Sequence, residues 1–472
     1  MKKENYIVIE DNSILDNYKE EEINRVNNII NNMTLNQKIG QMFVVGFSGT
    51  SMPSSLTSAI ETYNFGNVIL MGQNVSNPLT LKQMTTDIQN KMVSVNGLGG
   101  FISTDQEGGR VARLINGGTH IISQMAVSAT NNPQNGYLVG EIIGTELSHY
   151  GINVDYAPVL DVNNNPDNPV IGIRSYSDDP MQVALYGNNM FKGLTSKGVM
   201  GCAKHFPGHG NTNVDSHYGL PIIDSSIEEL YQVELAPFIS AIANGIDSIM
   251  TTHIIFSAID SKLPATLSEK VITGLLREQL GFDGIICTDG MEMSAVKDNF
   301  GGYGETAIKA IQAGCDMLLY TSISNPKTAH TALVNAVKSG QISEERINES
   351  VRRILLKKLK YGILDQNYNN SLDNFDEYLQ LAEEQNLQLA KEAVTNIKGE
   401  FNGLDKNPMF VFIMILISLI QVSFIYFGGT ILRATPLLRS ELLFTLGCAA
   451  LALPAELVRK MLWRFSGHSE GF

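Results

Sequence analysis

The segment VMGCAKHFPG (199–208) begins as an apolar run and ends in Lys204 and His205, which proline and glycine follow closely. A short apolar run bounded by turn-forming residues is typical of a strand that is buried on both faces. The two ionisable residues stand at the carboxyl end of that run. The segment therefore predicts a buried strand whose end presents polar side chains to a loop.

The same pattern recurs along the chain, with helical segments such as 227–245 and 268–281 between the apolar runs. Ser268 is placed to cap the second of these helices, and Gly281 follows its end. This alternation predicts a parallel sheet, and eight units in this length predict a (β/α)8 TIM-type barrel. A doubly wound open sheet is the alternative, since the order of strands cannot be read from the sequence. The predicted strands are 41–47, 67–71, 99–107, 152–162, 199–208, 248–256, 284–293 and 316–320.

Polar residues recur at the same end of several predicted strands. Asp105 and Glu107 follow FIST, Asp161 follows YAPVL, His253 follows SIMTT and Asp289 follows IICT. In a barrel of this type the loops after the carboxyl ends of the strands form the active face. We therefore expect these residues to gather at one end of the barrel.

Composition narrows the class of protein. The chain has 472 residues, of which 43% are hydrophobic and 17% charged, which is typical of a globular protein. Its net charge of −14 argues against a nucleic-acid-binding surface. Cys202, Cys287, Cys315 and Cys448 are widely spaced, which predicts reduced thiols rather than a disulfide framework or a metal clip. The N-terminal residues contain no apolar signal core, so the barrel is expected to be cytoplasmic.

The domain plan follows from these patterns. Residues 1–25 are predicted to be a lead-in, 26–362 the barrel, 363–400 a helical linker and 401–472 a short hydrophobic helical hairpin. MFVFIMILISLIQVSFIYF (409–427) carries no charge and is long enough to cross a bilayer, whereas LLFTLGCAALALPAELV (442–458) is shorter and contains proline and glutamate. The chain is therefore expected to associate with a membrane if 409–458 inserts.

Three segments carry candidate chemistry, and the first is STDQEGGRVARL (103–114). Its carboxylates and guanidinium groups offer paired acceptors and donors, which suit a polyhydroxylated ligand. The alternative is a local Asp–Arg pair that only fixes a turn.

The second segment, KHFPGHGNTNVDSH (204–217), contains three of the eight histidines. Asp215 and His217 stand two residues apart, and a carboxylate beside an imidazole suits a general acid/base that works near neutral pH. A metal site built from His205, His209 and His217 is the alternative. It is disfavoured because no carboxylate ligands accompany the histidines at regular spacing.

The third segment, GIICTDGMEM (284–293), places Asp289 directly at the end of an apolar strand. A rigid strand would fix the position of this carboxylate, which could act as a nucleophile toward a sugar carbon. The alternative is that Asp289 caps the helix that follows.

Taken together, these segments resemble one family. DQEGGRVAR (105–113), NPVIGIRSYSDDP (168–180), KHFPGHGNTNVDSHYGLP (204–221) and TDGMEM (288–293) occur in the order found in family 3 glycoside hydrolases of the bacterial β-N-acetylglucosaminidase (β-N-acetylhexosaminidase) type. The resemblance covers about residues 30–398. It implies a retaining exo-glycosidase that removes terminal β-linked N-acetylglucosamine from cell-wall-derived or chitin-type saccharides, through a covalent glycosyl-enzyme intermediate and without a cofactor or metal.

The resemblance also implies roles for individual residues. Asp289 matches the nucleophile, His217 the acid/base and Asp215 the partner that orients it. The residues that match ligands of the sugar hydroxyls are Asp105, Arg113, Arg174, Lys204 and His205.

Residues 400–472 instead resemble the last two transmembrane helices of calcium-transporting P-type ATPases. Two further functions remain open: a β-glucosidase or β-xylosidase of the same family, and a membrane-tethered sugar-binding protein without catalysis. The presence of Asp289, Asp215 and His217 favours an enzyme, because a binding protein needs no nucleophile. The expected partner is an N-acetylglucosamine-containing saccharide, and no oligomeric state is predicted.

Overall fold

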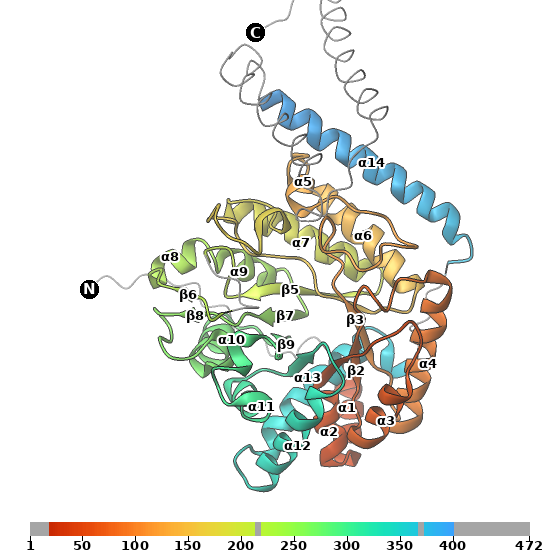
Figure 1. Ribbon diagram of the computed structural model, residues 1–472, viewed down its shortest axis with the longest axis vertical. Coiled ribbons are helices and arrows are strands. Elements are labelled where there is room, and N and C mark those ends of the chain that lie inside the picture. The colour runs from red at the N-terminus through yellow and green to blue at the C-terminus, as the bar shows by residue number, and fades with distance from the viewer. Residues whose placement is uncertain (1–17, 213–218, 367–371, 401–472) are drawn as a thin grey trace, which may run out of the picture. The chain divides into compact units, whose positions relative to one another are not determined.

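The computed structural model describes residues 18–212, 219–366 and 372–400, and their strands form a closed parallel barrel (Figure 1). Neighbouring strands follow the order β1-β10-β9-β7-β5-β4-β3-β2, so the last strand of the chain pairs with the first. This closure confirms the predicted barrel and excludes the open sheet. Each predicted apolar run contains one barrel strand: β1 Phe43–Gly46, β2 Asn67–Ile69, β3 Phe101–Thr104, β4 Val154–Asp155, β5 Met200–Phe206, β7 Ser248–Thr251, β9 Ile285–Gly290 and β10 Met317–Tyr320.

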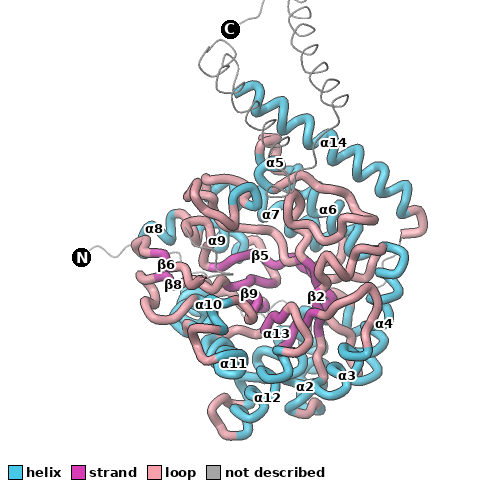
Figure 2. The backbone as a smooth tube through the Cα atoms, in the orientation of Figure 1, coloured by secondary structure: helices cyan, strands magenta, loops and turns pink. Residues whose placement is uncertain are grey.

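Helices surround the strands (Figure 2). They return the chain from the carboxyl end of each strand to the start of the next, as a parallel barrel requires. A separate two-stranded sheet pairs β6 (Ile222–Ile223) with β8 (Ile255–Phe256). The helices are α1 Glu20–Asn32, α2 Leu35–Gln41, α3 Ser54–Tyr63, α4 Pro78–Asn96, α5 Gln124–Ser128, α6 Gln134–His149, α7 Pro180–Ser196, α8 Ile227–Gln232, α9 Ala236–Ala243, α10 Ser294–Lys297, α11 Gly302–Ala313, α12 Asn325–Lys338, α13 Glu344–Lys360 and α14 Phe375–Glu400.

The two helices singled out in the sequence differ in detail from the prediction. Segment 227–245 forms two helices, α8 and α9, because the first ends at Val233. Helix α9 has Pro237 in its first turn, where the backbone N–H that proline lacks would have no partner within the helix. Segment 268–281 is helical, but its hydrogen bonds are those of a π-helix over Lys270–Gln279. The hydroxyl of Ser268 accepts a hydrogen bond from the backbone of Val271, and Gly281 follows with φ +66°.

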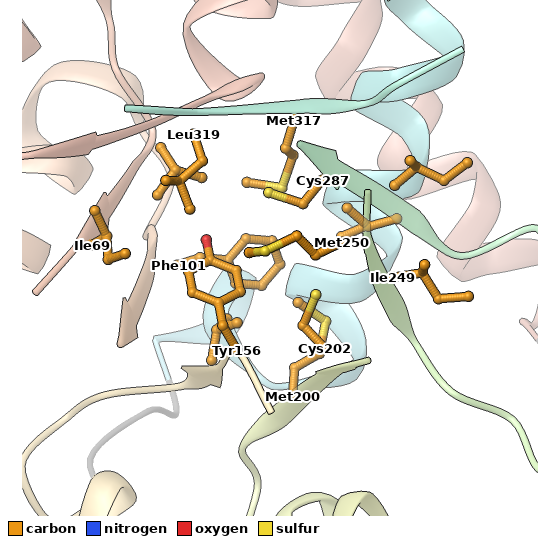
Figure 3. Packing of buried hydrophobic residues seen from close by; sticks show 14 of the residues in the cluster. Ile69, Phe101, Tyr156, Met200, Cys202, Ile249, Met250, Cys287, Met317 and Leu319 are labelled. Carbon is orange, nitrogen blue, oxygen red and sulfur yellow. The ribbon is translucent and has the colours of Figure 1, made fainter. Parts of the chain in front are cut away.

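The barrel interior is filled by buried side chains from facing strands (Figure 3). Along β7, Met250 points into the barrel interior and Ile249 lies on the opposite face of the strand, where it is also buried, as the two-residue period of a strand requires. Cys202 and Cys287 lie in the same interior as free thiols, and Cys315 is also buried and free. The interior is therefore a packed core and supplies a rigid base for the strand ends.

A buried lysine joins strands at the opposite, N-terminal end of the barrel. The ammonium of Lys358 on α13 donates to Gln41 Oε1 at 2.7 Å and to the carbonyl oxygens of Gly66 and Gly99 at 3.1 and 3.0 Å. These glycines precede β2 and β3. Burial lowers the pKa of Lys358 to about 7. One side chain therefore holds three separate segments at the base of the barrel.

Helix α14 lies in the segment expected to be a linker, and Ala382, Leu389 and Ala393 on it are buried. Asn386 accepts from the backbone of Ile122 and donates to the carbonyl of His120. Within the described ranges, no helix is long and apolar enough to cross a membrane. The segments 409–427 and 442–458 lie outside those ranges, so the hairpin and its membrane association stay predictions.

Replacing Lys358 with Met should lower the free energy of unfolding by about 3 kcal/mol at pH 8, because the buried acceptors lose the amine that donates to them. Above about pH 7 and up to its ordinary pKa, the unfolded chain binds a proton at Lys358 that the folded chain does not bind. The stability of the wild type should therefore rise with pH over this range, and the rise should be smaller in the variant. Urea unfolding at several pH values measures both effects. Lys338→Met, at an exposed position, is the control, and equal behaviour of the two variants would contradict the prediction.

Candidate active site

A cavity of about 450 Å³ opens at the carboxyl ends of the barrel strands. Its walls come from the ends of β2, β3, β5, β7, β9 and β10 and from the loops that follow strands, so it lies where the barrel fold predicts an active face. Met71, Met250 and Met293 supply part of an apolar wall. Six of the eight predicted site residues line the cavity: Asp105, Arg113, Arg174, Lys204, His205 and Asp289.

Five charged side chains form what we call the charge cluster: Asp105, Glu107, Arg113, Arg174 and Lys204. At its centre the Lys204 ammonium lies 2.8 Å from Asp105 Oδ1 and 2.7 Å from Glu107 Oε1. Burial lowers the pKa of Lys204, but the two carboxylates outweigh that effect and hold it above its ordinary value. For Asp105 burial acts in the opposite direction and raises the pKa, but the charges of Lys204 and then Arg113 bring it below the ordinary value. These side chains are therefore ionised together.

Glu107 links the centre of the charge cluster to its outer arginine. Arg174 donates to both Glu107 oxygens, at 2.8 and 2.7 Å, in a bidentate pair. Burial raises the pKa of Glu107, but the charges of Lys204 and Arg174 lower it to about 2. The sequence places Glu107 at a strand end but does not predict it as a site residue; its position after β3 is the signal that marks it. It fixes two of the predicted sugar ligands.

Asp105 and Arg113 also form the local pair considered in the sequence, with Nη2 and Oδ2 3.3 Å apart. That pair does not stand alone, because Asp105 is shared with Lys204 and both partners line the cavity. The pair is thus part of the cavity wall rather than of an isolated turn.

His205 is held by Asp161, the polar residue at the end of the segment containing β4. Asp161 Oδ2 lies 2.6 Å from His205 Nδ1, and Oδ1 accepts from the backbone of His205 and of His209 at 3.1 and 2.6 Å. Because a carboxylate accepts, Nδ1 carries the hydrogen. Burial raises the pKa of Asp161, but His205 brings it below the ordinary value. Asp161 was not predicted as a site residue, although its strand-end position marked it.

The histidines proposed as an alternative metal site are engaged in other contacts. His209 Nδ1 lies 3.1 Å from the Thr212 hydroxyl, and burial followed by the nearby His205 lowers the pKa of His209 to about 4. The third histidine, His217, lies outside the described residues. In the part of the chain that the structure describes, no group of three or more metal-ligating side chains is assembled.

Asp289 lies near the carboxyl end of strand β9, and it lines the cavity. Its Oδ1 accepts from the backbone of Gly290 at 2.7 Å. The next helix, α10, begins only at Ser294 and has no side-chain cap, so the alternative of Asp289 as a helix cap is wrong. His253 was expected on the same face, but it is fully buried and does not line the cavity. Its Nε2 donates to the Gly290 carbonyl at 3.1 Å, and it therefore supports the strand end that carries Asp289.

Asn168 joins two loops of the active face, a role that the sequence did not reveal. Its Nδ2 donates to the carbonyls of His209 and Gly210 at 2.8 and 2.9 Å, and its Oδ1 accepts from the backbone of Val170 and Ile171, both at 2.8 Å. Every hydrogen-bonding direction of one buried amide is thus used to hold the loop after β5 against the loop that contains Arg174.

The same two loops meet closely at Gly210, where an added Cβ would lie only 1.6 Å from the Val162 carbonyl oxygen. A glycine is therefore required for this approach.

Asp215 and His217, predicted as the orienting residue and the acid/base, lie in 213–218, outside the described residues. Their roles stay predictions.

Comparison with known proteins adds a family to this geometry. The model of the glycosyl hydrolase family 3 N terminal domain matches residues 34–356. Beta-hexosaminidase A of Pseudoalteromonas piscicida is 35% identical over 369 residues, which are 70% of this chain and 61% of that protein. The chain thus spans less than two thirds of that relative. These comparisons lend no support to the second resemblance, of residues 400–472 to calcium-transporting ATPases.

Solved structures agree with the family match. A family 3 β-N-acetylglucosaminidase from a Paenibacillus species superposes with a TM-score of 0.73 at 40% identity, covering 76% of this chain and 69% of that one. The β-N-acetylglucosaminidase from Thermotoga maritima gives a TM-score of 0.62 at 31% identity, covering 70% and 69%.

Replacing Glu107 with Gln should destabilise the protein by about 3 kcal/mol or more at pH 7, because Lys204 and Arg174 lose a buried counter-charge. The lowered pKa of Glu107 means that its stabilising effect is complete above about pH 4.5 and is lost as the pH falls toward 2. The difference between variant and wild type should shrink accordingly. Denaturant unfolding at pH 7 and pH 3 tests this, with the exposed Glu305→Gln as control. A difference that does not depend on pH would contradict the assignment.

Proposed function

Because the chain belongs to glycosyl hydrolase family 3, we propose that it is a retaining exo-glycosidase that removes terminal β-linked N-acetylglucosamine from saccharides derived from cell walls or chitin. The single observation that carries this proposal is the placement of Asp289 in one cavity with the charge cluster. A strand-end carboxylate supplies a nucleophile, and the fixed carboxylates, ammonium and guanidinium groups supply hydrogen-bond partners for sugar hydroxyls. The named activities of the related proteins support the substrate class.

The shape of the site supports attack on the end of a saccharide. The lining residues come from the ends of strands on different sides of the barrel, which favours a pocket over a groove that crosses the surface. The packed core lies below it, with Met250 and Leu319 shared between the core and the cavity wall. A pocket with a closed base accepts one terminal sugar and leaves the rest of the saccharide outside.

The proposed reaction has two steps. Asp289 attacks the anomeric carbon, the glycosidic carbon–oxygen bond breaks, and the departing oxygen takes a proton from His217. In the second step His217 removes a proton from water, which attacks the same carbon and releases Asp289 and a sugar with its original configuration. Asp215 orients the His217 ring. The assignments of His217 and Asp215 rest on the sequence resemblance.

The charge cluster favours this chemistry because it is built before the substrate arrives. Lys204 and Arg174 are held by Glu107, and His205 is held by Asp161, so binding a sugar does not require these side chains to be ordered. Groups that are already fixed in place lose little conformational entropy on binding. Orientation of the sugar against Asp289 is then the main contribution of the binding residues.

The substrate class is tested with the full chain and two aryl glycosides. The kcat/KM for an aryl N-acetyl-β-glucosaminide should exceed that for the aryl β-glucoside by at least about tenfold, because polar groups that bind the acetamido group are left unpaired by the glucoside. Addition of a chelator should not change the rate. Equal rates would favour the β-glucosidase alternative, and binding of N-acetylglucosamine without hydrolysis would favour the sugar-binding alternative.

The nucleophile is tested by Asp289→Asn, which keeps the size of the side chain but removes its charge. The kcat should fall by several orders of magnitude, because the covalent intermediate can no longer form. Asp298→Asn, at an exposed position in the same part of the chain, is the control and should retain full activity. More than about a tenth of wild-type activity in Asp289→Asn would reject the assignment.

A further inference from the structure

A second carboxylate, Glu292, lies three residues after Asp289 and also lines the cavity. It is half-buried in the loop between β9 and α10. One of its oxygens, Oε2, accepts from the backbone of Thr321 at 2.6 Å and from the Thr321 hydroxyl. The other, Oε1, accepts from the Ser322 hydroxyl and from Asn325 Nδ2, the latter at 2.6 Å. All four donors come from the segment that follows β10.

This pattern argues against Glu292 as a proton donor to the leaving group. Both oxygens accept hydrogen bonds, and the donors are neutral. Burial raises the pKa of Glu292, but the hydrogen bonds from Ser322, Thr321 and Asn325 outweigh it and bring the pKa below its ordinary value. A general acid needs the opposite, a carboxyl group that stays protonated near neutral pH.

What Glu292 does instead is fix the wall of the cavity beside Asp289. Thr321 lines the cavity, and its carbonyl oxygen lies so close to Gly46 that a Cβ added there would be 2.3 Å away. Below this point β9 and β10 are joined by hydrogen bonds between Met291 N and the Leu319 carbonyl, at 2.9 Å, and between Leu319 N and the Thr288 hydroxyl, at 3.1 Å. Thr321 is therefore held from below by the sheet, on one side by β1 and on the other by Glu292.

We propose that Glu292 is a positioning residue, which locks the segment after β10 to the loop that carries Asp289 so that the bound sugar and the nucleophile keep a fixed relative position. This inference rests on the proposed glycosidase function. Its consequence for catalysis is geometric: loosening the wall weakens substrate binding and alignment. It does not change proton transfer, so the loss should not depend on how good the leaving group is.

The test is Glu292→Gln in the full chain, because glutamine has the same shape but its amide nitrogen cannot accept two of the four hydrogen bonds. We expect kcat/KM to fall about tenfold, mostly through KM, by the same factor for aryl N-acetyl-β-glucosaminides whose phenols differ widely in pKa. His217→Ala is the comparison, and its loss should grow as the leaving group becomes poorer. Glu146→Gln is the matched control, since Glu146 is a buried carboxylate that holds Thr119 but does not line the cavity.

A double-mutant cycle with Asn325→Ala shows whether Glu292 acts through the segment after β10. The two substitutions should be non-additive in kcat/KM, because each removes part of the same contact. Additive effects, an unchanged KM in Glu292→Gln, or a loss that grows with the pKa of the phenol would each overturn the proposal. The last result would make Glu292 an acid/base.

Hydrogen exchange separates failure of this inference from failure of the proposed function. The amide of Thr321 should exchange faster in Glu292→Gln than in the wild type, whereas amides of the buried strand β3 should not change. This measurement needs no substrate. If the wild type hydrolyses no aryl glycoside, the proposed function fails. Faster exchange at Thr321 in Glu292→Gln would still support the inference that Glu292 holds the segment after β10. Unchanged exchange at Thr321 in this variant would overturn that inference, whatever activity the wild type shows.

Discussion

The active face depends on one buried cation, the ammonium of Lys204, whose side chain is only 3% exposed. Such a charge is stable away from water only when it is paired, and here two carboxylates share it. Those carboxylates are in turn paired with Arg113 and Arg174. A chain of ion pairs therefore runs from Lys204 at a strand end to the walls of the cavity. The same charges that keep the fold intact thereby hold a set of donors and acceptors in place for a polyhydroxylated ligand.

The loops above this charge cluster are fixed by a different kind of contact. Asn168 and Glu292 each tie two loops together through four or more hydrogen bonds to neutral groups of the chain. Two carbonyl oxygens pressed against Gly46 and Gly210 limit how far the loops can shift. Charge therefore fixes the walls of the cavity near the strand ends, and directional hydrogen bonds and close backbone packing fix its rim. The proposed glycosidase reaction needs both, because the sugar must be bound and its anomeric carbon must also face the nucleophile.

Much of the fold and part of the site could be predicted from the sequence. All eight barrel strands lie inside predicted apolar runs, because a strand buried on both faces leaves a continuous apolar signal. Asp105, Lys204 and Asp289 stand out as polar residues at the ends of such runs, and the family resemblance implies their roles; all three line the cavity. Segment 227–245 is predicted as one helix but forms two; Val233 gives no local sign of the break, and only Pro237 marks the start of the second helix.

The partners of those residues were decided only by tertiary structure. Glu107 and Asp161 could be seen at strand ends, but their tasks depend on which strands become neighbours when the barrel closes, and that order is not written in any local pattern. Asn168 donates to acceptors that lie 41 to 44 residues away along the chain, and Glu292 accepts from donors that lie 29 to 33 residues away. His253 points beneath the cavity rather than into it. Sequence determines which residues end each strand, because apolar runs and turn residues act locally. Barrel closure and strand register determine which of those residues meet, because contact between distant segments is a property of the folded chain.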